Sequence, residues 1–325
     1  MGEFAIRGLD VEQLGTAAEL FTREYQRCRE LLPSLPERYE RPDGILELLQ
    51  ESMVYASGYG CFSGDKLCGY MLAIGLPDFR GLRSIFIPEW GHASRKEGRE
   101  EIYYLLYKEL AGSWVKEGFN NHLISFFQHQ QKLYDDFHWL GFGLLAVDAM
   151  RGLEDDISTG KGGKLQVRKA GEDDVDIVLS FKEKLDKYMA ESPTLFYYTK
   201  EEDEDKDYFK ELLTSPGSTA FLAYEGERAV GCLAIGKAND DAAYVINDPQ
   251  TASIKYAFLE EAYRGSGAGL DLLLPALSWA REHGYSRCSV DFEPENIAAR
   301  SFWLKHYTPF CYTLRRYIDR KEGGR

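Results

Sequence analysis

The sequence predicts an α/β protein built from two tandem domains of similar topology. The chain has 325 residues, 44% of them hydrophobic, which is enough for two domains with separate cores. Three features of the first half return in the second half after 161 to 164 residues. They are a short strand that leads into a helix (4–7 and 165–168), a strand, turn and strand with similar glycines (64–75 and 226–236), and a Trp-Leu pair (139–140 and 303–304). An internal duplication accounts for all three.

The boundary between the domains is expected in a glycine-rich stretch near the middle of the chain. Residues 158–163 read Ser-Thr-Gly-Lys-Gly-Gly and follow the polar residues 154–156. Glycine and serine give a chain the freedom of a flexible linker. We therefore expect a first domain over 1–157, a linker over 158–163 and a second domain over 164–325.

The overall charge argues against one class of partner. The formal net charge is −14 and both halves are acidic, whereas nucleic-acid binding needs a basic surface. The charge weakly favours a neutral or cationic substrate. No apolar run approaches eighteen residues, and the N-terminus lacks the basic and apolar segments of a secretory signal. We expect no nucleic-acid or membrane partner and a cytoplasmic protein.

The cysteines and histidines predict neither disulfides nor a metal site. The six cysteines are spread along the chain without a Cys-x-x-Cys pair, and a core of this size does not need disulfides. Four histidines of the first half, at 92, 122, 129 and 138, lack the spacing of metal ligands. We expect reduced, mostly buried thiols and no bound metal.

The second half contains a glycine-rich segment between a predicted strand and a predicted helix. Apolar residues at 254, 256 and 258 indicate the strand, and leucines at 270, 273, 274 and 277 indicate the helix. Between them lies Arg264-Gly-Ser-Gly-Ala-Gly269. The start of a helix has unpaired amide groups, and glycines let a phosphate approach them closely. The segment is a candidate pyrophosphate cradle, and a purely structural turn is the alternative.

A second motif follows this helix, and the two motifs together indicate what the glycine-rich segment binds. A short strand over 288–292 is followed by Asn296 and by a second helix that carries Ala299 and Trp303. The arrangement resembles the acetyl-CoA site of the Gcn5-related N-acetyltransferase (GNAT) superfamily. In that superfamily Gln/Arg-x-x-Gly-x-Gly/Ala is followed, one helix and one strand later, by Asn-x-x-Ala and an aromatic residue.

The resemblance implies a fold and a set of coenzyme contacts. Each domain is expected to be a mixed, mostly antiparallel, twisted sheet flanked by helices, with a splayed pair of parallel strands that holds acetyl-CoA. The implied coenzyme contacts are Leu259, Glu261, Arg264, Gly265, Ser266, Gly267, Ala268, Gly269, Asn296, Ala299 and Trp303. Asn296 is equally well suited to capping the helix that follows it.

The corresponding segment of the first half is predicted to be degenerate. Arg95 and Gly98 keep two positions of the motif, but Glu100 stands in place of the last glycine. A carboxylate there would repel a pyrophosphate, and its side chain would limit access to the backbone. We expect the coenzyme to bind only the second half, with the first half as its structural partner.

The chain differs from many members of the superfamily at the residue that protonates the leaving thiolate. Many members carry a tyrosine seven residues after the motif asparagine, and this chain has Trp303. An indole N–H donates a hydrogen bond but has no useful acidity near neutral pH. Tyr307, Tyr312 or water is left to supply the proton.

Three carboxylates are candidates for the group that accepts the proton of the amine. Glu260, Asp291 and Glu293 lie on or just after the two strands that are expected to flank the cleft. Glu293 is the first choice, because the loop after its strand should reach the acceptor pocket. A solvated surface carboxylate is the alternative for each.

The function implied by the resemblance is acetyl transfer from acetyl-CoA to a primary amine of a small molecule or peptide, directly, in a ternary complex. The competing interpretation is a sensor or interaction module that binds acyl-CoA without turnover. The sequence does not reveal the acceptor, and it is compatible with a monomer or a homodimer.

Overall fold

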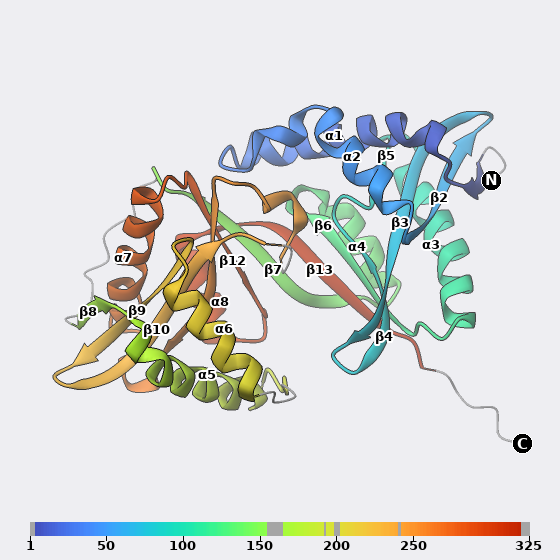
Figure 1. The fold of residues 1–325 in the computed structure, drawn as a ribbon. Helices are drawn as coiled ribbons and strands as arrows, with labels where there is room; N and C mark the ends of the chain where they lie inside the picture. The colour runs from blue at the N-terminus through green and yellow to red at the C-terminus, as the bar shows by residue number, and fades with distance from the viewer. Residues whose placement is uncertain (1–3, 155–164, 192, 198–201, 240–241, 320–325) are drawn as a thin grey trace, which may run out of the picture. The chain divides into compact units, whose positions relative to one another are not determined.

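The computed structural model describes residues 4–154, 165–191, 193–197, 202–239 and 242–319 (Figure 1). These residues divide into two compact units. The first comprises Met1–Ala146, Ala243–Val245 and Phe310–Arg325, and the second comprises Val147–Ala242 and Ile246–Pro309. The linker expected at 158–163 lies outside the described residues.

The first unit is a mixed sheet with four helices. Its strands run in the order β1 (Ala5–Gly8), β2 (Ala56–Ser63), β3 (Lys66–Phe79), β4 (Leu82–Ile87), β6 (Asn121–Phe127) and β13 (Thr308–Tyr317), and β5 (His92–Ser94) pairs with β3. Among the strand pairs described in this unit, only β4 and β6 are parallel. The helices are α1 (Leu14–Leu31), α2 (Asp43–Ser52), α3 (Arg99–Lys116) and α4 (Gln131–Trp139).

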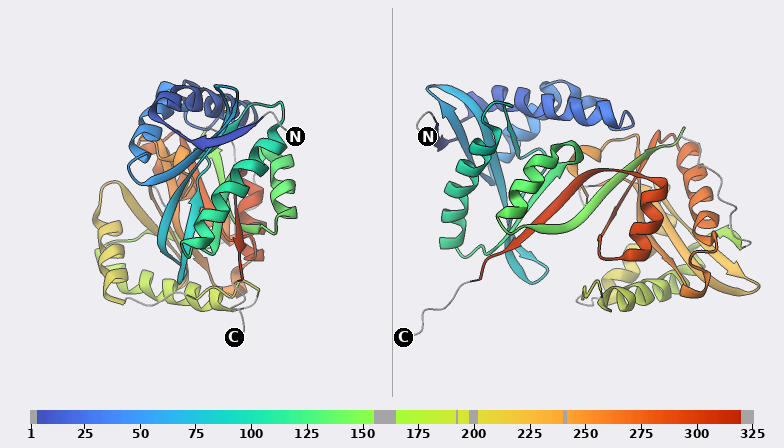
Figure 2. Two further views of the ribbon diagram at one scale, coloured as in Figure 1. Left: turned by 90° about the vertical axis from the view of Figure 1, so that its right-hand side faces the viewer. Right: turned by 180° about the vertical axis from the view of Figure 1, so that it is seen from behind.

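The second unit repeats this plan, as the duplication in the sequence predicts. Its strands run in the order β7 (Gly143–Gly152), β12 (Arg287–Phe292), β11 (Thr251–Leu259), β10 (Arg228–Lys237), β9 (Ser218–Glu225) and β8 (Gln166–Lys169). Within the described part of this unit, only β11 and β12 form a parallel pair. The helices are α5 (Val175–Ala190), α6 (Glu202–Thr214), α7 (Ala268–Glu282) and α8 (Ile297–His306), and Figure 2 shows them from two further sides. The expected mixed, mostly antiparallel sheet flanked by helices is confirmed.

Each half of the chain gives its last strand to the sheet of the other half. Residues 147–152 of β7, which end the first half, pair with β12. Residues 311–317 of β13, which end the second half, pair with β6. For this reason the compact units do not follow the domain limits expected from the sequence, which assign each half to one continuous segment.

Alternating side chains of β10 explain how helices cover both faces of the second sheet. Cys232 and Ala234 belong to a core formed with residues of α5 and α6, such as Phe181 and Phe209. On the opposite face, a Cβ added to Gly231 would lie 3.2 Å from Leu272 of α7. A strand with apolar residues on both faces is buried on both faces.

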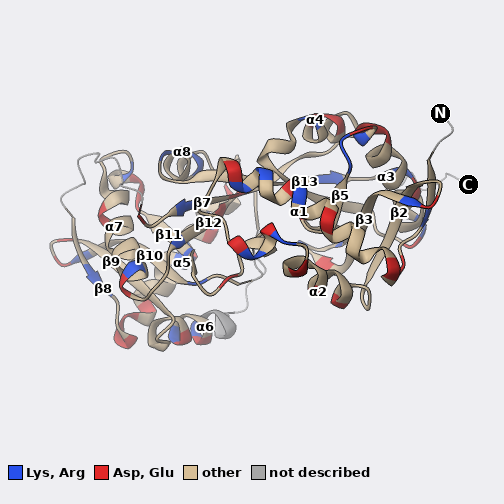
Figure 3. Ribbon diagram, turned by 90° about the horizontal axis from the view of Figure 1, so that it is seen from above, with Lys and Arg blue, Asp and Glu red and all other residues tan. Residues whose placement is uncertain are grey.

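The charged residues are mixed along both units, with Lys and Arg interspersed among Asp and Glu (Figure 3). Among the described residues, no helix is long and apolar enough to cross a membrane. The same residues contain no group of three or more His, Cys, Asp or Glu placed to hold a metal ion. All six cysteines are buried, and no disulfide joins any two of them.

Candidate active site

The two parallel strands of the second unit separate after a short pairing. Their register joins residues 251–253 to residues 287–289, after which β11 continues to Leu259 with β10 as its neighbour. The β10–β11 register shifts so that Lys255 is an extra residue in β11. A bulge bends the strand that contains it. The corresponding strands of the first unit, β4 and β6, do not separate in this way. The last residue of β4, Ile87, is still paired with β6.

A cavity of about 850 Å³ lies where the strands separate. It is lined by the end of β11, the glycine-rich loop, the first turns of α7 and one face of α8. Nine of the eleven predicted coenzyme contacts line it: Leu259, Arg264, Gly265, Ser266, Gly267, Gly269, Asn296, Ala299 and Trp303. The other two, Glu261 and Ala268, are absent from its wall.

The glycine-rich loop needs glycine for its backbone conformation at two positions. Gly265 has φ 74° and Gly267, the N-cap of α7, has φ 93°. Side chains disfavour this left-handed region. Arg264 fixes the start of the loop, because its Nε donates to the carbonyl oxygen of Leu259 at 2.9 Å and its guanidinium lies 4.4 Å from the ring of Tyr188. The loop therefore presents backbone amides and a helix N-terminus to the cavity.

The last glycine of the motif has a different requirement. A Cβ added to Gly269 would lie 2.7 Å from Cε2 of Phe302 on α8. This glycine lets α7 and α8 approach each other closely. The sequence predicts a coenzyme contact at Gly269, whereas its packing against Phe302 appears only in the structure.

Asn296 holds the start of α8 in place. Its Oδ1 accepts a hydrogen bond from the backbone N–H of Ala299 at 3.1 Å, and its Nδ2 lies 3.4 Å from Sδ of Met189. The capping interpretation of Asn296 is thus confirmed. Because Asn296 also lines the cavity, the two interpretations left open by the sequence are compatible.

One face of α8 supplies the aromatic wall of the cavity. Trp303 is 5% exposed and packs edge-on against Phe302 and Tyr307. His306 also lines the cavity, with its ring centroid 4.9 Å from that of Phe302. The sequence analysis did not select His306, although it follows Ala299 and Trp303 at the spacing of one helical face.

The carboxylate candidates lie near the cavity but do not line it. Glu260 forms ion pairs with Lys184, at 2.8 Å, and with Arg228. Asp291 is an exposed residue of β12, and Glu293 follows that strand, where its backbone carbonyl oxygen accepts the backbone N–H of Asn296 at 3.1 Å. This main-chain bond closes a turn from Glu293 to Asn296, and Asn296 lines the cavity.

Tyr307 is buried away from the cavity wall. Its hydroxyl donates to Sγ of Cys288 at 3.3 Å, and its ring lies 5.9 Å from the guanidinium of Arg151. Burial, together with the neighbouring thiol, raises the pKa of Tyr307 well above its ordinary value. Burial likewise raises the pKa of the Cys288 thiol to about 12.

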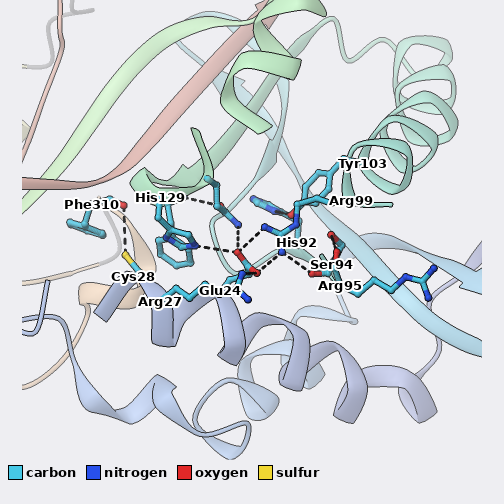
Figure 4. A network of polar contacts seen from close by, with 12 residues as sticks. Glu24, Arg27, Cys28, His92, Ser94, Arg95, Arg99, Tyr103, His129 and Phe310 are labelled. Atoms are coloured by element: carbon cyan, nitrogen blue, oxygen red, sulfur yellow. Dashed lines mark hydrogen bonds and ion pairs between the residues drawn. The ribbon is translucent and has the colours of Figure 1, made fainter. Parts of the chain in front are cut away.

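In the first unit, a buried ion pair lies beside the start of α3 (Figure 4). Glu24 of α1 accepts hydrogen bonds from Arg99 at 2.5 and 3.2 Å, and from His129 and Gln130 at 3.2 Å each. Burial opposes ionisation of Glu24, but the hydrogen bond from His129 and the charge of Arg99 lower its pKa to about 2. Gly98 keeps the left-handed N-cap position, with φ 71°.

Comparison with known proteins agrees with this geometry. A sequence model described as the acetyltransferase (GNAT) family matches residues 186–307. Streptothricin acetyltransferase A of Bacillus subtilis (strain 168) is 29% identical over 111 residues, which cover 34% of this chain and 58% of that protein. The chain thus spans less than two thirds of that relative.

Solved structures resemble nearly the whole chain. A GCN5-related N-acetyltransferase from Sphaerobacter thermophilus has a TM-score of 0.57 at 13% identity, covering 98% of this chain and 97% of that one. A tandem GNAT protein from the clavulanic acid biosynthesis pathway has a TM-score of 0.54 at 11% identity, covering 98% and 100%. Residues 186–307 thus match the acetyltransferase (GNAT) family, and the chain as a whole has a fold similar to that of the tandem GNAT protein.

Proposed function

We propose that this chain is an acetyl-CoA-dependent N-acetyltransferase that moves an acetyl group to a primary amine of a small molecule or peptide. The transfer is direct, in a ternary complex, and takes place in the second unit. The observation that supports it best is the cavity between the separated strands, with the N-terminus of α7 and its two left-handed glycines in its wall.

Each part of the cavity suits one part of acetyl-CoA. The amides of residues 265–269 and the positive end of α7 suit the pyrophosphate, since helix N-termini bind anions. The apolar wall at Ala257, Phe258 and Leu259 suits the pantetheine arm, and backbone groups that β11 no longer shares with β12 are available to pair with it. Acetyl-CoA supplies the activated acyl group as a substrate.

The chain's own contribution to the rate is chiefly orientation. Holding an amine and a thioester in attack geometry accounts for a large part of such accelerations. Glu293 is proposed to accept the proton of an acceptor that arrives as an ammonium ion, because it belongs to the short loop between β12 and the cap of α8. Trp303 is proposed to donate a hydrogen bond to the thiolate and not a proton.

The acceptor is proposed to be neutral or cationic. The formal charge of −14 favours such a molecule. The curated relative is named for streptothricin, so this compound belongs among the first acceptors to be tested.

Release of free thiol from acetyl-CoA tests the proposal. The full chain is mixed with acetyl-CoA and, in turn, with streptothricin, spermidine, glucosamine and short peptides with a free N-terminus. Amine-dependent thiol release with matching mass gain of the amine supports an acetyltransferase. Tight binding of acetyl-CoA without turnover on any amine favours the sensor or interaction module instead.

A further inference from the structure

His306 is the feature of the cavity that the proposed function does not use. It is the last residue of α8, it lines the cavity, and its ring contacts that of Phe302 with the centroids 4.9 Å apart. Its backbone oxygen accepts a hydrogen bond from Arg151 of β7 at 3.1 Å. The residue is therefore fixed at both its backbone and its ring.

The wall of the cavity holds four other side chains with a titratable group. They are Tyr188, Cys232, Arg264 and Lys305. Tyrosine, lysine and arginine ordinarily titrate at about pH 10 or above. Burial raises the pKa of the Cys232 thiol far above its ordinary value. Histidine is the side chain that ordinarily changes charge between about pH 5 and 8.

The surroundings of His306 keep its ring neutral. Burial lowers its pKa below 6.5, and the positive charges of Arg151 on β7 and Lys305 on α8 lower it further. A neutral imidazole has one ring nitrogen that accepts a proton and one that donates. At neutral pH the ring is therefore ready to accept a proton from a reaction in the cavity.

We propose that His306 is a catalytic proton shuttle, which takes a proton from the attacking amine nitrogen and gives it to the sulfur of the leaving coenzyme. The inference rests on the proposed acetyl transfer. The lone pair of the amine forms the C–N bond, and the electron pair of the C–S bond leaves with sulfur. The amine nitrogen then loses one proton to His306, and the thiolate gains it, so that amide and free thiol are the products.

This role fits the neighbouring residues. Trp303, one turn earlier on the same face of α8, has no proton to give near neutral pH. Glu293 acts at a different step, the removal of a proton from an ammonium ion before attack. The contact of Gly269 with Phe302 holds the ring on which His306 packs.

The test compares His306→Gln with the parent protein, using acetyl-CoA and the amine of the panel above that gives the fastest thiol release. We expect unchanged affinity for acetyl-CoA by calorimetry and a fall in kcat of about 10²–10⁴-fold, the range for a positioned acid or base. The parent kcat should decline as the pH falls below 6.5, and this decline should be absent in the variant. Imidazole should partly restore turnover to His306→Ala.

His283→Gln is the matched control, because His283 is an exposed residue at the end of α7 and is absent from the cavity wall. It should retain the parent kcat and pH profile. A kcat of His306→Gln close to that of the parent, or a low kcat with an unaltered acidic limb and no rescue by imidazole, would overturn the shuttle. Failure of the parent itself to release thiol would instead count against the proposed function.

Discussion

Gly269 and Phe302 join α7 to α8 so closely that a Cβ on Gly269 would lie 2.7 Å from the Phe302 ring. Gly269→Ala should therefore lower the unfolding temperature, because overpacking costs about 1–3 kcal/mol. Gly112→Ala in α3 is the control, since its new Cβ meets nothing within 4 Å. That variant should be slightly more stable, as alanine is favoured over glycine inside a helix. Equal effects of the two substitutions would argue against the contact.

Because Glu24 belongs to a buried ion pair, we expect Glu24→Gln to lower the free energy of unfolding strongly. Removing one partner leaves the Arg99 guanidinium with too few acceptors, which typically costs about 3–5 kcal/mol. Glu19→Gln changes an exposed pair with Arg23 on the same helix and should cost little. Urea unfolding of the two variants measures the difference, and similar midpoints would show that Glu24 contributes no more than a surface charge.

Acidification should lower the stability of the folded protein by protonating Glu24. The pKa of Glu24 is lowered to about 2, so its contribution to stability is complete above its unfolded value near 4.5 and is lost as the pH falls toward 2. Glu24→Gln should therefore lose less stability than the parent between these values. Parallel curves for the two proteins would contradict the assignment.

Glu89 predicts a pH dependence of the opposite sign. Burial raises its pKa to about 7, and its carboxyl accepts the backbone N–H of Val245 at 2.9 Å. The folded protein therefore holds a proton that the unfolded chain releases, and stability should fall as the pH rises from 4.5 to 7, by ~3 kcal/mol at most. Glu89→Gln, which cannot ionise, should lack this fall. A parent whose unfolding temperature is constant over this range would refute the prediction.

The sequence predicts the second unit well because its signals are local. The glycines of the loop after Arg264 are needed for the conformation of the loop itself, and Asn296 caps the helix that directly follows it. Each role involves only residues that are close in sequence, so the motifs and their spacing are enough to find them. The exchange of β7 and β13 is not predictable in the same way. It depends on which sheet edge each strand meets, and the hydrophobic pattern of a strand does not encode its partner.

The catalytic groups were harder to select for a related reason. Tyr307 and His306 are consecutive, yet the tyrosine hydroxyl points to Cys288 while the histidine lines the cavity. Helical phase decides between them, and the end of α8 at His306 is set by tertiary structure. Likewise, nothing in the local sequence shows that Glu24 and Arg99, 75 residues apart, form a pair.

Glu293 and Trp303 should differ in their effect on turnover. If Glu293 accepts the ammonium proton, Glu293→Gln should keep coenzyme affinity and lower kcat about 10²–10⁴-fold. Trp303→Phe removes one hydrogen-bond donor and should cost about 1.5–3 kcal/mol at most in the barrier. Measuring both with one amine, above and below its pKa, separates the roles. A parent-like kcat in Glu293→Gln would remove this carboxylate and turn attention to Asp291 and Glu260.

Calorimetric titration of the full chain with acetyl-CoA tests the central claim most directly. The account predicts one site per chain, lost in Gly267→Glu, which places a carboxylate at the N-cap of α7. Gly98→Glu is the matched control, because Gly98 occupies the same left-handed position before α3. It should leave the binding intact. Two equivalent sites in the parent, or unaltered binding in Gly267→Glu, would contradict a coenzyme site confined to the second unit.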